Sequence, residues 1–403
     1  MQADLATLFL VALIAVAAPL VTELPVKLRL PIVVVEIVLG IIVGPHVLGW
    51  AQPAGVLAFL GALGLAFLFF LAGLELDFEA LRGRPLRLGL GSWLVTITAA
   101  LTVTFLLRAL GFLDAPIMIA TALATTAVGV LLPILRDSGE LNTRFGTLAM
   151  GAGAVGELGP VVAVSVILTR EHTAWHQTAL LLAFAGVALV AAMAALHVRL
   201  QPVMQLLGRT LHASSQLPVR ICILLLVGLV VLASEFGLDL ILGAFAAGMV
   251  VRLGSEGSRG VVLREKLEAI GFGFLVPVFF VLSGIKFDLA ALLESSDALL
   301  RVPFFLALFL LLRGGPALLI YRNALKKHER LPFVLYISTA LPLIVAITDI
   351  GVQTGRMRTD NAAALVGAGM ASVLLFPLIA LILRKRAGAA RPGHGRGDEE
   401  DAM

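Results

Sequence analysis

Charged residues and cysteine are both scarce in this sequence. Only 14% of its 403 residues are charged, whereas soluble domains carry about a quarter, and this low charge excludes a soluble enzyme. The sequence instead contains repeated apolar stretches of about 20 residues, the length that a helix needs to cross a bilayer. The single cysteine, Cys222, excludes an internal disulfide, and its apolar surroundings predict a packing role. The composition therefore predicts an all-α polytopic membrane protein.

Thirteen apolar segments are predicted to cross the membrane. They lie at 5–24, 31–49, 56–76, 86–109, 115–135, 143–169, 177–197, 218–236, 238–253, 266–285, 301–321, 331–352 and 361–383. The first has no basic stretch before it and no small-residue cleavage site after it, so we expect a retained span rather than a signal peptide. We expect residues 1–385 to form one transmembrane domain. Residues 386–403 are basic, then rich in Gly and Pro, then acidic, and predict a disordered cytoplasmic tail.

The distribution of Lys and Arg between the loops predicts the orientation. If the C-terminus is cytoplasmic, 23 of the 30 basic residues lie in cytoplasmic loops and 6 in outer loops, and only Arg313 lies within a span. This asymmetry obeys the positive-inside rule, and the odd number of spans then places the N-terminus outside. It also explains the basic isoelectric point through loops that face anionic lipid headgroups. We therefore expect a protein of the cytoplasmic (plasma) membrane with no nucleic-acid partner.

Two pairs of related motifs indicate an internal repeat. "FFLAGLELDFEAL" at 69–81 aligns with "FFVLSGIKFDLAAL" at 279–292, and "LGIIVG" at 39–44 more weakly resembles "LGAFAAG" at 242–248. Both pairs are seven spans apart, and because seven is odd the related helices would start from opposite faces of the membrane. This predicts two inverted repeats of six spans, joined by a connector helix at 177–197, as in many secondary transporters. The alternative is that both matches are common helix-end patterns.

Spans five and twelve contain helix-breaking residues at similar depths. The first carries Thr125, Thr126 and Pro133, and the second carries Thr339 and Pro342. We expect both to be discontinuous helices that cross near the middle of the membrane, with Pro133, Thr339 and Pro342 at the breaks. Because broken backbone at this depth must face protein or a water-filled cavity, Thr125 and Thr126 become candidate ion ligands. The alternative is a simple proline kink in each helix.

The stretch "GAGAVGELGPVV" at 151–162 places one acid, Glu157, halfway along an apolar span. A charged side chain there costs about 2.5–3.5 kcal/mol, so Glu157 must be protonated, ion-bound or paired for much of the time. A carboxylate that binds either a proton or a small monovalent cation, but not both at once, is the minimum requirement for exchange. The alternative is a structural or snorkelling glutamate. The glycines also spell G-x-G-x-x-G, but the residues on both sides read as one continuous apolar helix with no preceding strand, which excludes a dinucleotide loop.

Three other charged residues lie at membrane depth. Arg313 is deep in span eleven, where it could neutralise Glu157, anchor carbonyl groups at a helix break or act in transport. Glu36 lies inside span two and could reach the cytoplasmic surface or line a funnel. Asp349, near the outer end of span twelve, is either solvated or lines a path to the site. No nucleophile–base pair or metal-ligand cluster recurs on neighbouring spans, so we expect neither an enzyme nor a cofactor.

Taken together, these motifs resemble a known transporter family. The run "LPIVVVEIVLGIIVGPHVLGW", the endings "FLFFLAGLELDFEALR" and "VFFVLSGIKFDL", and the acid in span six are similar to the monovalent cation:proton antiporter-2 family, the Kef/Nap-type sodium–proton exchanger domain. The resemblance covers about residues 5–385 and implies the sodium/proton antiporter fold. It also implies a homodimer, with 1–85 and 218–292 at the dimer interface and 86–169 and 301–385 as a core that moves like an elevator.

The chain departs from the family pattern at two positions. Members usually carry two adjacent polar residues in span six, where this sequence has Gly156 and Glu157, and often a lysine where it has Arg313. The lost first side chain favours electroneutral exchange of one monovalent cation, Na⁺ or K⁺, for one H⁺. The alternatives are a channel-like potassium efflux protein, or an exporter of an organic cation or metabolite on the same scaffold. Kef-type members also carry a C-terminal nucleotide-gating domain, which we do not expect here because the sequence stops before one.

Overall fold

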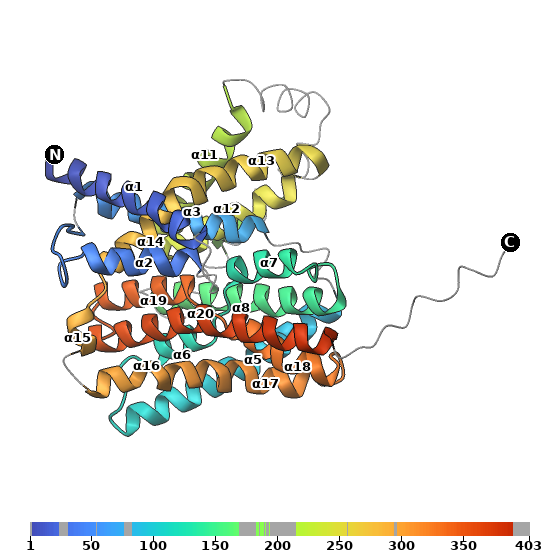
Figure 1. Cartoon of the computed structure of the whole chain (residues 1–403). Coiled ribbons are helices and arrows are strands. Elements are labelled where there is room, and N and C mark those ends of the chain that lie inside the picture. Colours follow the sequence, from blue (N-terminus) through green and yellow to red (C-terminus); the bar gives the residue numbers. More distant parts are fainter. Residues whose placement is uncertain are drawn as a thin grey trace.

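The computed structural model describes residues 2–23, 31–53, 55–75, 83–168, 215–255, 257–293 and 296–389, together with a few positions between 183 and 193 (Figure 1). Within these ranges the chain forms α-helices and two π-helical segments. The elements are α1 (Gln2–Glu23), α2 (Ile32–Val43), α3 (Gly55–Glu75), α5 (Arg84–Ala109), α6 (Pro116–Leu123), α7 (Val128–Asp137), α8 (Arg144–Leu168), α11 (Leu217–Glu235), α12 (Leu240–Gly254), α13 (Gly257–Ile270), η1 (Gly271–Leu275), α14 (Val276–Ile285), α15 (Leu289–Leu293), α16 (Ser296–Leu308), η2 (Phe309–Gly314), α17 (Gly315–Ile320), α18 (Lys327–Ile337), α19 (Pro342–Gln353) and α20 (Thr359–Ala389).

Within the described part of the chain, nine helices are long and apolar enough to cross a membrane, and three shorter apolar helices accompany them. The nine are Leu5–Thr22, Gly55–Glu75, Arg84–Ala109, Arg144–Val164, Leu217–Glu235, Gly260–Ile285, Leu299–Ile320, Lys327–Gln353 and Thr359–Arg384, and the three are Ile32–Val43, Pro116–Leu132 and Leu240–Gly254. Each overlaps one predicted span. The predicted connector at 177–197 lies largely outside the described residues, so the full set of thirteen stays a prediction.

Helices α2 and α20 end at other residues than predicted. Helix α2 ends at Val43 instead of continuing to residue 49, because Gly44 precedes Pro45 and the residue before a proline avoids helical backbone. Helix α20 continues to Ala389, so residues 386–389 of the predicted disordered tail are helical. Helix α20 therefore continues beyond its apolar residues into the basic residues that follow them. The rest of the predicted tail lies outside the described residues.

The helices pack into two groups, which lie one above the other in Figure 1. The first group consists of α1–α3 and α11–α14 with η1, in which α3 packs on α12 and α2 packs on α14. The second group consists of α5–α8 and α16–α20 with η2, in which α5 packs on α8 and α20 packs on α16, α18 and α19. Helix α1 begins at one end of the bundle and α20 ends at the other (Figure 1).

Close glycine contacts hold the main helix pairs of the first group together. A Cβ at any of four glycines would overlap a backbone carbonyl of the partner helix: Gly73 that of Phe245, Gly248 that of Phe70, Gly284 that of Ile37 and Gly40 that of Val281. In every case the approached carbonyl belongs to the residue three positions before the glycine of its own helix: Phe245 precedes Gly248 by three, for example, and Phe70 precedes Gly73 by three. The α3–α12 and α14–α2 crossings therefore use the same local geometry, and only glycine permits this approach of the backbones.

Two predicted spans are interrupted by non-helical backbone. Span five is divided into α6 and α7 by residues 124–127, and span twelve is divided into α18 and α19 by residues 338–341. In the second interruption Pro342 is the first residue of α19, and Leu341 before it has φ −150° and ψ −55°, as expected for a residue that a following proline keeps out of the helix. Pro133, which was predicted to lie at a break, lies instead inside α7.

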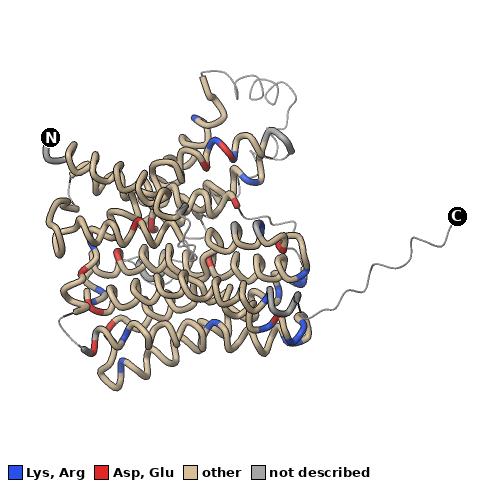
Figure 2. Tube along the Cα trace, in the orientation of Figure 1, with Lys and Arg blue, Asp and Glu red and all other residues tan. Residues whose placement is uncertain are grey.

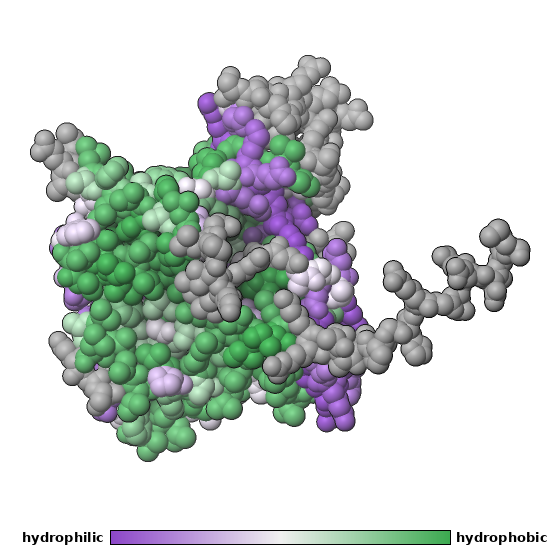
Figure 3. Space-filling view, in the orientation of Figure 1, coloured by the Kyte–Doolittle hydropathy of each residue, from purple (hydrophilic) through white to green (hydrophobic). Residues whose placement is uncertain are grey.

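The surface of the bundle matches a lipid environment. Most charged residues lie near the two ends of the helices (Figure 2), and the face shown in Figure 3 is largely apolar, with hydrophilic residues gathered mainly at one end. Large apolar side chains such as Phe9, Leu224 and Leu319 are at least 70% exposed. Exposed apolar surface on this scale is stable in contact with acyl chains and not with water, so the protein is an integral membrane protein.

Candidate functional site

The two interruptions contact each other inside the second group. The Ala127 N–H donates to the Thr339 carbonyl at 2.9 Å, and the Thr126 hydroxyl donates to the Ile337 carbonyl at 2.6 Å. Each broken helix thus satisfies backbone groups that the other exposes. Such mutual satisfaction is what permits non-helical backbone at membrane depth.

Helix α8 brings its acid to this crossing point. The Thr126 N–H donates to the Gly156 carbonyl at 3.0 Å, which places the next residue, Glu157, beside the start of α7. Glu157 is only 6% exposed, and its Oε2 has no hydrogen-bond partner among the described residues. The backbone N–H of Val128, the first residue of α7, interacts with the carboxylate, and a helix N-terminus carries partial positive charge. The carboxylate therefore retains lone pairs with which to bind a proton or a cation.

Arg313 is fully buried and is held by neutral acceptors. It lies in the π-helical segment η2, its Nε donates to the Thr126 hydroxyl at 2.9 Å, and its Nη2 donates to the Ala152 carbonyl at 2.7 Å. Its Nη1 has no hydrogen-bond partner among the described residues. The sequence left open whether Arg313 neutralises Glu157, anchors carbonyl groups at a helix break or acts in transport. In the structure it anchors the break residue Thr126 through its hydroxyl, and the carbonyl that it holds, that of Ala152, lies within α8. π-Helical turns often occur at functional positions because they redirect one side chain.

The space above Gly156 is already occupied. A Cβ on Gly156 would lie 2.5 Å from Arg313 Nη2 and 2.6 Å from the Thr126 hydroxyl oxygen. These separations are shorter than any normal contact of a methyl group, so no side chain fits at position 156 while Arg313 keeps its hydrogen bonds. The guanidinium of Arg313 therefore occupies the space that a side chain at position 156 would need, which explains why this chain combines a glycine in span six with an arginine in span eleven.

The remaining predicted break and ligand residues lie around this crossing. The hydroxyls of Thr125 and Thr339 each donate to a carbonyl of the preceding helical turn, that of Ala122 at 2.7 Å and that of Leu335 at 3.0 Å. Both threonines thereby close the helix that ends before the interruption. The interruption between α18 and α19 is further supported by Ser372 of α20, whose hydroxyl accepts the Ala340 N–H at 3.1 Å.

A second buried acid, which is not among the predicted site residues, lies at the end of α3. The Glu75 side chain is 8% exposed, its Oε2 has no hydrogen-bond partner among the described residues, and the other oxygen lies 3.9 Å from Arg264 Nη2. It lies close enough to Glu157 for a negative charge on one carboxylate to disfavour a negative charge on the other. The "GLELD" motif contains this residue, and its position at the last turn of an apolar helix was the signal that could have identified it.

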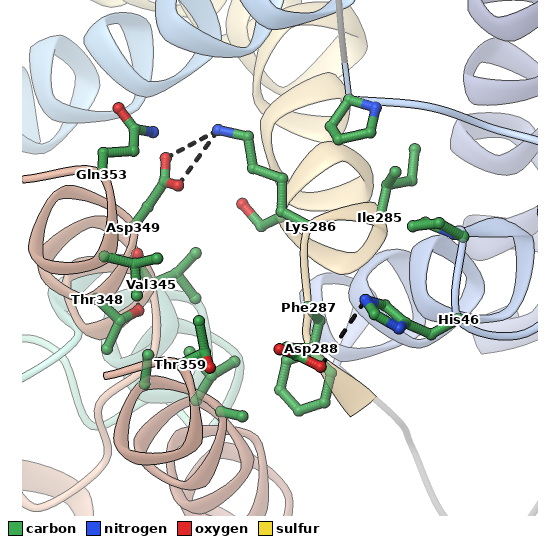
Figure 4. A pocket seen from close by; sticks show the side chains of 17 residues that line it. His46, Ile285, Lys286, Phe287, Asp288, Val345, Thr348, Asp349, Gln353 and Thr359 are labelled. Carbon is green, nitrogen blue, oxygen red and sulfur yellow. Dashed lines mark hydrogen bonds and ion pairs between the residues drawn. The ribbon is translucent and has the colours of Figure 1, made fainter. Parts of the chain in front are cut away.

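Glu36 and Asp349 lie apart from the crossing. Glu36 is 2% exposed on α2, in the first group. Asp349 lies on α19 and lines a cavity of about 350 Å³ between the two groups, where its carboxylate contacts Lys286 (Figure 4). Among the described residues neither acid has a hydrogen bond or ion pair to Glu157, and no cluster of three or more His, Cys, Asp or Glu side chains could hold a metal ion. The crossing is therefore a site with one buried carboxylate.

The family of the chain follows from a comparison with protein-family models. The model described as "Sodium/hydrogen exchanger, transmembrane" matches residues 10–383. The chain belongs to this family. The sodium/hydrogen exchanger family consists of transporters, and the match contains both helix interruptions, Glu157 and Arg313.

Individual sodium/hydrogen exchangers resemble the chain over most of its length. It is 27% identical to the putative Na⁺/H⁺ antiporter YjbQ of Bacillus subtilis, in a match that covers 95% of this chain and 64% of YjbQ. It is 24% identical to the Na⁺/H⁺ antiporter of Enterococcus hirae, with 94% and 98% covered. The chain thus spans less than two thirds of YjbQ and nearly all of the Enterococcus protein.

The fold is also that of a solved member of this class of transporter. The structure of the sodium proton antiporter MjNhaP1 from Methanocaldococcus jannaschii superposes with a TM-score of 0.69, covering 97% of this chain and 98% of that protein, at 18% sequence identity. At this identity the likeness establishes a shared fold.

Proposed function

We propose that the protein is a secondary active antiporter that exchanges a monovalent cation for H⁺ at Glu157. The observation that carries this proposal is a buried carboxylate with an unpartnered oxygen, placed where two interrupted helices meet. Family membership and relatives named as Na⁺/H⁺ antiporters support it. Sodium is therefore the first cation to test, and potassium is the second.

Competition for one carboxylate couples the two fluxes. Glu157 binds a proton covalently or a cation through its oxygens, and it cannot hold both. Burial makes the empty, charged carboxylate costly, so the site crosses the membrane loaded with one or the other. Thr126 is hydrogen-bonded through its N–H to Gly156, the residue before the acid, and Thr125 precedes it in the same interruption. Both hydroxyl hydrogens are committed to carbonyl groups, and the Thr126 hydroxyl also accepts from Arg313, so Thr125 has the more available hydroxyl lone pairs for a cation.

The charges at the site favour electroneutral exchange of one cation for one proton. Arg313 carries a permanent charge and is hydrogen-bonded to Thr126 and Ala152 rather than to a titratable group. The cation-loaded and proton-loaded sites then have the same net charge. Gly156 provides no second carboxylate that could bind an extra proton.

Alternating access requires one group of helices to move against the other. We assign the moving core to the second group, which contains both interruptions, and the dimer interface to the first. The matching glycine contacts of the α3–α12 and α14–α2 crossings support the inverted repeat, because an inverted copy of α3 and α12 corresponds to α14 and α2. Under the loop-charge argument the N-terminus is outside and the C-terminus is cytoplasmic.

The test is cation-dependent proton flux in proteoliposomes. Under an imposed pH gradient the wild-type protein should move protons when Na⁺ or K⁺ is added to the opposite side, and Glu157→Gln should abolish this flux. Glu235→Gln is the matched control, because Glu235 is an exposed acid at the end of α11. Clamping the membrane potential should leave the rate unchanged if exchange is electroneutral.

Two results would contradict the proposal. Wild-type flux in Glu157→Gln would show that the site lies elsewhere. Cation flux that moves no protons and does not saturate would instead indicate a channel.

A further inference from the structure

A cavity separates the two helix groups at the end of the bundle that is predicted to face outside. It has a volume of about 350 Å³ and is lined on one side by residues of α2 and α14 and their ends, including His46 and Ser283, and on the other by residues of α19 and α20, including Thr348 and Thr359 (Figure 4). Polar side chains from both groups point into it. A hydrated monovalent cation would meet this cavity before it reached the interior.

One ion pair joins the two groups across this cavity. Lys286, directly after α14, places its Nζ 3.1 and 3.2 Å from the two carboxylate oxygens of Asp349 on α19 (Figure 4). Helix α14 packs on α2 and α3, whereas α19 packs on α20 and α6. The neighbouring contact between His46 and Asp288, at 3.8 Å, stays within the side of the cavity formed by α2 and α14. The Lys286–Asp349 pair therefore bridges the two groups.

We propose that Lys286 is a tethered counter-ion that occupies Asp349 in place of an incoming cation and so controls access from the outer cavity. This inference rests on the proposed cation/proton exchange. An ammonium group carries the same single charge as an alkali cation and binds the same carboxylate oxygens. The Lys286 and Asp349 side chains are 29% and 26% exposed, and ion pairs with this much solvent contact are weak enough to exchange partners. Because the pair bridges both groups, it must also separate whenever they move apart at this end.

The first experiment is a double-mutant cycle in proteoliposomes. Lys286→Gln should lower the KM for cation added on the outer side by up to about fivefold without lowering kcat, because Asp349 is then free. In an Asp349→Asn background the same substitution should have no effect on KM. Asp114→Asn is the control, because Asp114 forms an ion pair with Arg358 at 3.4 Å within the second group.

The second experiment tests separation of the groups directly. Because Cys222 is the sole cysteine, a Cys222→Ala background allows Lys286→Cys and Asp349→Cys to be joined with a short thiol-reactive cross-linker that contains a disulfide. Cross-linking should stop exchange, and reduction should restore it. Cross-linking Asp114→Cys to Arg358→Cys should leave exchange unchanged.

The outcomes separate this inference from the proposed function. An unchanged KM in Lys286→Gln, a KM effect that persists without Asp349, or full exchange in the cross-linked protein would each overturn the role of Lys286. A wild-type protein that shows no cation/proton exchange would overturn the proposed function itself.

Discussion

Gly156→Ala is the substitution whose effect follows most directly from the structure. The added methyl carbon would lie 2.5 Å from Arg313 Nη2 and 2.6 Å from the Thr126 hydroxyl oxygen. Both atoms are fixed, because Arg313 Nη2 donates to Ala152 at 2.7 Å and the Thr126 hydroxyl donates to Ile337 at 2.6 Å. One of these hydrogen bonds must break or the helices must separate, and overpacking of this kind costs about 1–3 kcal/mol.

The consequences can be measured as stability and as transport. Thermal unfolding in detergent should show a lower midpoint for Gly156→Ala, and proteoliposome flux should fall, because the displaced groups position the interruption beside Glu157. Gly315→Ala is the matched control, since no atom lies within 4 Å of a Cβ at that helical glycine. It should be neutral or slightly stabilising, because glycine is a poorer helix former than alanine.

A double mutant tests the stated cause. Arg313→Lys removes the guanidinium nitrogens that the methyl group would meet, so the further loss caused by Gly156→Ala should be smaller in that background. Residues in direct contact usually show such coupling, of about 0.5–3 kcal/mol. Additive effects of the two substitutions, or wild-type stability of Gly156→Ala, would refute the reasoning.

Three further predictions follow from the site. As pH falls, the apparent KM for the cation should rise, approaching tenfold per pH unit, because one proton competes with one cation; a KM independent of pH would exclude a shared carboxylate. At alkaline pH, where few protons compete for Glu157, Glu75→Gln should raise the cation KM, because it removes a buried carboxylate whose negative charge favours a cation at the site, and an unchanged KM at that pH would count against this influence. Ser372→Ala should lower the unfolding midpoint, because it leaves the buried Ala340 N–H without its acceptor, which costs about 1–3 kcal/mol. Thr98→Ala, on an exposed helix face, is its control and should change the midpoint little.

The sequence predicted those features that depend on local chemistry and on counting residues. Apolar length was enough to locate the spans that the structure describes. Pro342 predicted an interruption because a proline constrains the residue before it. The depth of Glu157 followed from its distance to both ends of its span. In each case the information lies within a few residues or one helix.

Features that depend on partners far along the chain could not be predicted. The break in span five was predicted, but not its position at 124–127. That stretch contains no proline and is held by Ala127 bonding to Thr339, so Pro133 was a misleading signal for the position. Arg313 lies within an apolar helix of membrane-spanning length, as predicted, but its partner Thr126 is 187 residues away. The reason that position 156 is a glycine is visible only in the structure, where the Arg313 guanidinium fills the space of a Cβ.

The central claim, that a cation and a proton compete for Glu157, is tested most directly by proton release on cation binding. Purified protein in weakly buffered detergent solution is titrated with NaCl or KCl at slightly acidic pH while released protons are counted, with choline chloride as the ionic-strength control. The account predicts up to one proton released per chain in the wild type and none in Glu157→Gln. Equal release from both proteins, or cation binding without release from the wild type, would contradict it.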